Sequence, residues 1–104
     1  MQTVFVKTVF DINCKLFNYA RKKGIQPAYR VLVNDELFTE RTWIWQDVYL
    51  EEILQIQAVP GQYRIQLQAV IPEYQKFTMT NHRIEHGPAR WIDNEHLEIT
   101  HESQ

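Results

Sequence analysis

Two histidines and a glutamate stand close together in the string His82-Arg83-Ile84-Glu85-His86. This string fits the H-x-x-E-H pattern of inverted zinc peptidases, in which the two imidazoles bind a zinc ion. The pattern works only on a helix, because only there do the two histidines lie one turn apart on the same face. Gly87-Pro88 would end such a helix at once, and residues 77–80 alternate as a strand does. We therefore interpret the match as chance and expect no metal site and no cofactor.

Other nucleophiles are few. Ser103, the only serine, is the penultimate residue, so a Ser/His/Asp set cannot be assembled around it. Cys14 could pair with a histidine as a nucleophile, but a lone cysteine beside Leu16 and Phe17 is typical of a small buried hydrophobic side chain. The 3 glycines leave no room for a glycine-rich phosphate loop. The residue types predict a protein that is not an enzyme.

The charge of the chain does not favour a nucleic-acid partner, since the formal net charge is -2 and the pI is near 6.0. One basic run, Arg21-Lys22-Lys23, stands near Tyr19 and Arg30 and could bind phosphate. A solvated loop, or a contact with an acidic neighbour, explains the run more simply. We expect no nucleic-acid partner.

Carboxylates stand mostly at the predicted strand ends, where oxygen-rich loops could bind calcium. No D-x-D-x-D ladder fixes such a site, so solvated loop charges are the simpler interpretation. Glu51 and Glu52 are neighbours that point to opposite faces of a strand, so they cannot flank one glycosidic bond, and we expect both at the rim of a sheet. The carboxylates concerned are Asp35, Glu36, Asp47, Glu51, Glu52, Asp93 and Glu95.

The best candidates for a binding site are Trp43 and Trp45, which share one face if the strand before them continues. Two flat indoles could stack on sugar rings, with hydrogen bonds from Arg41, Gln46 and Asp47. Large aromatic side chains also anchor small cores and subunit interfaces. We favour the core or an interface for this pair and keep a glycan platform as the alternative.

The composition is that of one globular domain over residues 1–104, with 44% hydrophobic and 23% charged residues. The single cysteine excludes an intrachain disulfide and a multi-cysteine zinc site. The first residues, MQTVFVKTVF, lack the features of a secretory signal, and no stretch approaches the roughly 18 apolar residues of a membrane span. We expect a protein made in the cytoplasm that gains stability from packing or from partners.

Residues 54–70, reading LQIQAVPGQYRIQLQAV, carry the clearest structural signal. Apolar and polar residues alternate on both sides of Pro60-Gly61, which predicts two half-buried strands joined by a turn as a hairpin. Such a hairpin has one dry face and one wet face. The wet face would be a polar strip suited to docking on a partner, made of Gln55, Gln57, Arg64, Gln66 and Gln68.

The same alternation recurs along the chain and predicts seven or eight short strands with turns about every ten residues. Residues 11–28 lose it and fit either a long loop or a short helix, and residues 46–53 fit either helix or strand. We predict an all-β fold, a single antiparallel β-sandwich or jelly-roll-like domain. The further strands are expected over residues 2–10, 29–33, 37–42, 76–80 and 97–101.

Residues 29–70, with YRVLVNDELFTERTWIW and then VYLEEILQIQAVPGQYRIQLQAV, resemble two groups of small β-sandwiches. One group is the accessory structural proteins of tailed-bacteriophage virions, such as head-decoration and tail-associated proteins. The other is the calcium-dependent carbohydrate-binding modules. The first resemblance implies a non-enzymatic virion protein that docks on other subunits or on its own copies, and the second implies a glycan-binding module. The absence of a signal peptide and of a linker favours the virion protein.

Overall fold

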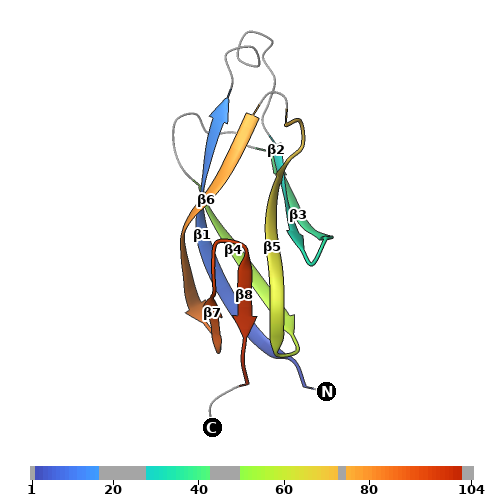
Figure 1. Cartoon of the computed structure of the whole chain (residues 1–104), viewed down its shortest axis with the longest axis vertical. Coiled ribbons are helices and arrows are strands. Elements are labelled where there is room, and N and C mark those ends of the chain that lie inside the picture. Colours follow the sequence, from blue (N-terminus) through green and yellow to red (C-terminus); the bar gives the residue numbers. More distant parts are fainter. Residues whose placement is uncertain (1, 17–27, 43–49, 73–74, 102–104) are drawn as a thin grey trace.

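A computed structural model describes residues 2–16, 28–42, 50–72 and 75–101 as eight strands in two antiparallel sheets packed together (Figure 1). The predicted all-β sandwich is confirmed. One sheet has three strands in the order β4-β1-β6, and the other has five in the order β3-β2-β5-β8-β7. The strands are β1 (Val4–Leu16), β2 (Ala28–Val33), β3 (Glu36–Thr42), β4 (Leu50–Ala58), β5 (Gly61–Ala69), β6 (Gln75–His86), β7 (Ala89–Trp91) and β8 (His96–Ile99).

Strand β1 is the centre of the three-stranded sheet and is longer than predicted. It runs through Leu16, so the expected loop or helix is wrong for residues 11–16; residues 17–27 lie outside the described residues. The alternation in fact continues, because Ile12 is buried and Asn13 is exposed. The long strand β6 supplies the hydrogen-bonding partner for this extension, with Ile12 opposite Met79.

Strands β4 and β5 do not form the predicted hairpin, because β4 pairs with β1 and β5 pairs with β2 and β8. The short connection through Pro60 carries the chain from one sheet to the other (Figure 1). The wet side of β4 and the wet side of β5 therefore lie on opposite outer faces of the sandwich. Alternation shows which side chains of a strand face inward, but it does not show which strand lies beside it.

The hairpin of β2 and β3 is confirmed. Its turn places Asn34 and Asp35 in the left-handed region, with φ of 50° and 67°, as a two-residue hairpin turn requires. Asn34 also ties the turn to β5, because its Oδ1 accepts a hydrogen bond from the backbone N–H of Arg64 at 2.8 Å.

The core fills the space between the two sheets. Its side chains come from the inward-facing positions of β1, β2, β4, β5 and β8, and each fully buried aliphatic side chain contributes roughly 2 kcal/mol. Cys14, Phe77 and Met79 are partly buried and pack against this core, as expected. The buried members are Val4, Val6, Phe10, Ile12, Tyr29, Val31, Leu54, Ile56, Ile65, Leu97 and Ile99.

One side of the sandwich is closed by a tight corner between β6 and β7. Gly87 lies in this corner with φ of 97°. A Cβ at this position would collide with the carbonyl oxygen of Phe5 and would lie 3.0 Å from the Cα of Val6. The corner can pass this close to β1 only because residue 87 has no side chain.

We predict that Gly87→Ala lowers the free energy of unfolding by roughly 2 kcal/mol or more, since it combines a left-handed φ with a backbone collision. Gly61 offers a matched control: its φ is also positive, 154°, but nothing lies within 4 Å of an added Cβ. Gly61→Ala should cost about 1 kcal/mol. Urea denaturation of both variants measures the difference, and equal losses would contradict the role of close packing at Gly87.

Candidate functional site

A carboxylate is buried between the two sheets. Glu52 stands in the same phase of β4 as Leu54 and Ile56, so its side chain points inward and is only 2% exposed. The expected position at a sheet rim is therefore wrong for Glu52, whereas Glu51 is exposed. Burying an ionised carboxylate is costly unless it is hydrogen-bonded and paired with a positive charge.

Glu52 receives both kinds of partner from the opposite sheet. The Tyr29 hydroxyl of β2 donates a hydrogen bond to its Oε1 at 2.7 Å, and Nε of Arg41 in β3 donates to the same oxygen at 2.6 Å. Burial, followed by the hydrogen bond to Glu52, raises the pKa of Tyr29 well above its ordinary value. The hydrogen bond to Glu52 also raises the pKa of Arg41. A neutral phenol and a charged guanidinium thus hold the carboxylate, and the cluster ties the sheets together.

A groove of about 370 Å³ opens beside this cluster, between the edge strands β3 and β4. Carboxylates at its rim are paired, because Glu40 lies 3.5 Å from Nε of Arg30 and Glu51 lies 3.2 Å from Nη2 of Arg83. Arg41, whose side chain is 49% exposed, can still offer hydrogen-bond donors to a ligand. The groove is lined by Glu40, Arg41, Thr42, Leu50, Glu51, Glu52 and Ile53.

Arg41 is the one member of the predicted tryptophan site that the structure describes, and it is engaged by Glu52. Trp43, Trp45, Gln46 and Asp47 lie outside the described residues, so the glycan platform stays a prediction. The basic run at residues 21–23 and Tyr19 also lie outside them.

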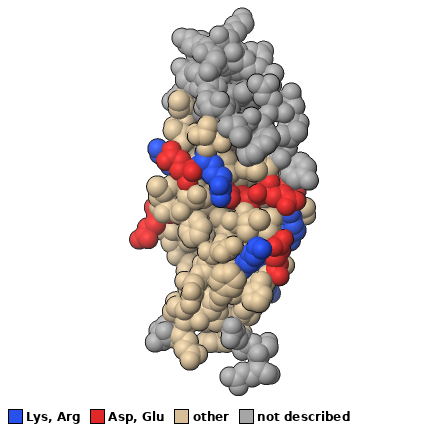
Figure 2. Space-filling view, turned by 180° about the vertical axis from the view of Figure 1, so that it is seen from behind, with Lys and Arg blue, Asp and Glu red and all other residues tan. Residues whose placement is uncertain are grey.

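The outer face of the three-stranded sheet carries large apolar side chains beside glutamines. Phe5 is directly opposite Gln57 in the β1–β4 register, and Ile53 is opposite Val9. Phe5 is 40% exposed and Ile53 is 43% exposed. Seen from behind, the charged side chains form a band across the middle of the molecule, with a largely uncharged surface beyond it (Figure 2). This face combines apolar and hydrogen-bonding groups, as the buried centre of a protein interface does.

The other half of the predicted polar strip lies on the outer face of the five-stranded sheet and is tied into a local network. Arg64 lies 3.6 Å from the carboxylate of Glu95. The amide of Gln66, in the orientation that satisfies its neighbours, donates to Asp35 at 3.0 Å and accepts from Nη2 of Arg64 at 2.9 Å. Gln68 is exposed. The strip is thus divided between the two outer faces, and a docking role for each half stays a prediction.

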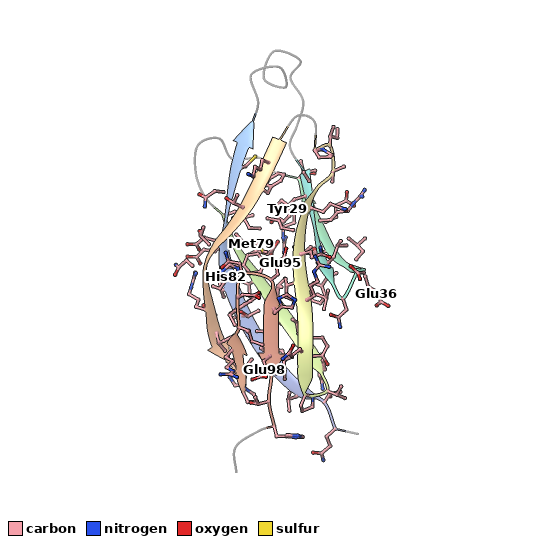
Figure 3. All side chains as sticks on the ribbon, in the orientation of Figure 1. Tyr29, Glu36, Met79, His82, Glu95 and Glu98 are labelled. Atoms are coloured by element: carbon pink, nitrogen blue, oxygen red, sulfur yellow. The ribbon has the colours of Figure 1, made fainter. Side chains whose placement is uncertain are left out.

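The H-x-x-E-H string lies on strand β6, not on a helix. Four residues of strand separate its histidines by roughly 13 Å, which is too far for one zinc ion. His86 is exposed and lies against Phe5, with ring centroids 5.6 Å apart. His82 lies between the sheets instead, with its ring 5.6 Å from that of Phe10 and 4.6 Å from that of Trp91 (Figure 3).

Most of the described carboxylates of the possible calcium site have partners of their own: Asp35, Glu51, Glu52, Asp93 and Glu95. The Oδ1 atom of Asp93 accepts hydrogen bonds from the backbone N–H groups of Glu95 and His96, both at 2.8 Å, and these contacts and the His96 side chain lower the pKa of Asp93. Within residues 2–16, 28–42, 50–72 and 75–101, no three His, Cys, Asp or Glu side chains form a group that could hold a metal ion.

Two clusters were not predicted from the sequence: Tyr29 with Arg41 and Glu52, and His82 with Trp91. A signal for the first was present, because Glu52 shares the phase of the apolar residues in β4. The second depends on β7, a strand of 3 residues that is too short to show alternation.

Comparisons with protein-family models, with curated proteins and with solved structures found no match to this chain. Among the described residues, no helix is long and apolar enough to cross a membrane. The class of protein is thus given by the fold alone, which is a small β-sandwich. The surfaces of this sandwich are the basis for proposing a function.

We predict that Glu52→Gln lowers the free energy of unfolding by about 2–4 kcal/mol, because it removes the charge that holds Arg41 and weakens the acceptor for Tyr29. The neighbouring Glu51→Gln is a matched control, since it removes only an exposed ion pair with Arg83 and should cost less than about 1 kcal/mol. Chemical denaturation followed by far-UV circular dichroism measures both. Similar losses in the two variants would show that the buried cluster does not tie the sheets together.

Proposed function

We propose that this chain is a non-enzymatic structural or assembly protein that docks on other protein subunits. The docking surface is the outer face of the three-stranded sheet, made of Phe5, Ile53, Gln55 and Gln57. The observation that carries the proposal is the exposure of Phe5 and Ile53, at 40% and 43%, on this face.

The chemistry of this surface suits a protein partner. When a partner covers exposed apolar side chains, the free energy of the complex falls by about 25 cal/mol for each Å² of apolar surface removed from water. Gln55 and Gln57, both exposed, supply donors and acceptors around them without the desolvation cost of a charge. One charged side chain, Lys7, lies on this face opposite Gln55, and it is paired with Glu85 at 3.3 Å. Farther along the sheet, Asp11 and Arg83 pair at 3.2 Å.

The free edge of β4 adds a second means of contact. This strand of 9 residues is the edge of its sheet, with no neighbouring strand on its outer side among the described residues. An exposed edge presents backbone N–H and C=O groups to which a partner strand can pair. Such pairing would bring the partner next to Ile53 and Gln55.

The particular setting that we propose is the virion of a tailed bacteriophage, where the chain would be a head-decoration or tail-associated protein. This rests on the resemblance of residues 29–70 to such accessory proteins. Bound across neighbouring subunits, a protein of this kind stabilises the assembly by mass action and needs no chemistry of its own.

We predict that a photo-reactive amino acid placed at Gln55, in the protein made in its natural cells, cross-links to one defined protein subunit or to a second copy of the chain. Ile53→Arg should reduce this cross-link at least about tenfold, because a charge is then buried in the contact. Ile92→Arg is a matched control, since Ile92 is the same residue type, is 48% exposed and lies after β7.

Identification of the cross-linked subunit by mass spectrometry then tests the virion setting. The docking proposal is overturned if the cross-link at Gln55 is unaffected by Ile53→Arg. It is also overturned if the purified protein stays monomeric, forms no cross-link and binds a glycan array in a manner that Trp43→Ala abolishes. That second outcome would establish the alternative glycan-binding module.

A further inference from the structure

His82 is a titratable side chain at the closed side of the sandwich. Its ring packs against Phe10 of β1 and Trp91 of β7, which also contact each other edge-on with centroids 6.1 Å apart, and Figure 3 shows His82 in the space between the sheets. The Nε2 atom of this imidazole is buried and has no hydrogen-bond partner. The imidazole donates a hydrogen bond to the backbone carbonyl of Asn94, in the β7–β8 turn, a contact that by itself raises the pKa of His82. A neutral imidazole can leave Nε2 as a bare acceptor, whereas an imidazolium carries an N–H there that must find an acceptor.

The nearest hydroxyl is already engaged. Nε1 of Trp91 donates to Oγ1 of Thr8 at 2.7 Å, and the Thr8 hydroxyl donates its own hydrogen to the carbonyl of Arg83 at 2.7 Å. Trp91 is therefore held to β1 by a hydrogen bond and to β6 by its contact with the His82 ring. These two contacts fasten β7, an edge strand of only 3 residues, onto the three-stranded sheet.

We propose that His82 is an acid-sensitive clasp: adding a proton at Nε2 displaces Trp91 from Thr8 and loosens β7 and the β7–β8 turn from the sandwich. Nε2 is buried without a partner, so the new N–H must reach water or another acceptor to be satisfied. Trp91 packs against the imidazole, with ring centroids 4.6 Å apart, so its movement would open a path for water to the ring.

The charged groups around His82 do not offset this cost. On β1 and β6, Asp11 and Arg83 pair with one another on the outer face. On β4, Glu52 is opposite Phe10, so the Phe10 residue separates it from His82. In the β7–β8 turn, the carboxylates of Asp93 and Glu95 are paired with His96 and Arg64, respectively.

The direction of the effect follows from burial, which lowers the pKa of His82 below its ordinary value. The unfolded or loosened chain takes up a proton near pH ~6.5, while the closed form takes it up only at lower pH. The clasp is therefore fully effective above about pH 6.5, and it weakens as the pH falls from there through the pKa of the closed form.

The experiment is an NMR titration of the full chain from about pH 7.5 to about pH 5.0. It follows the histidine Cε1–H signals, the indole N–H of Trp91 and the amide protection of residues 91–96. We expect the pKa of His82 to lie below the ordinary histidine value of about 6.5, and the protection of Trp91 and the β7–β8 turn to fall at least about tenfold across this range.

His82→Phe should abolish the loss of protection, because its ring still packs on Phe10 and Trp91 but cannot take a proton. His101→Gln is the control and should leave the loss unchanged, since His101 is exposed. The proposal is overturned if the pKa of His82 lies at or above about 6.5, as it would if the aromatic rings stabilised the cation. It is equally overturned if Trp91 stays protected at both pH values. Both of these outcomes are measured on the unaltered protein, so they decide the question even if His82→Phe does not fold.

Discussion

The structure depends on a carboxylate that is removed from water and held by the opposite sheet. Glu52 belongs to the three-stranded sheet, while its two donors, Tyr29 and Arg41, belong to the five-stranded sheet. A buried charge tolerates little displacement of its partners, because an unpaired carboxylate between two sheets is far more costly than a lost apolar contact. This requirement fixes the position of β4 against β2 and β3. Both β3 and β4 are edge strands that do not pair with each other. The Glu52 cluster therefore joins the two sheets at a place where no backbone hydrogen bonds between these two strands do so.

The two long sides of the sandwich are therefore closed by different means. On one side, the chain passes directly from β6 to β7 through the Gly87 corner, and packing of the backbone against Phe5 and Val6 keeps the sheets together. On the other side, an ion pair and a hydrogen bond do so, and a groove remains open beside them. Both long sides of the sandwich are thereby closed by contacts within the described residues. The apolar side chains left outside, such as Phe5 and Ile53, are not needed for closure, and this is why we assign them to a partner.

Local alternation was sufficient to predict most strands and the direction in which their side chains face. It correctly placed Leu54, Ile56 and Ile65 inside, and it placed Gln55 and Gln57 outside. It could not predict that β4 and β5 belong to different sheets, because a turn at Pro60-Gly61 suits a hairpin and a corner between sheets equally well. Glu52 was misplaced for a chemical reason: a glutamate is almost never fully buried without partners, and its partners, Tyr29 and Arg41, are 23 and 11 residues away in the sequence.

Glu52 and His82 occupy the same layer of the core, on either side of Phe10, and they solve the problem of a buried polar group differently. The carboxylate has two donors in place, so its charge is part of the folded structure. The imidazole has a buried nitrogen without a partner, so it fits the folded structure only when it is neutral. The acid response that we propose therefore belongs to His82, beside Trp91 and the short strand β7. Protonation of His82 would loosen the corner side of the sandwich, whereas Glu52 and the free edge of β4 lie on the other side of the core.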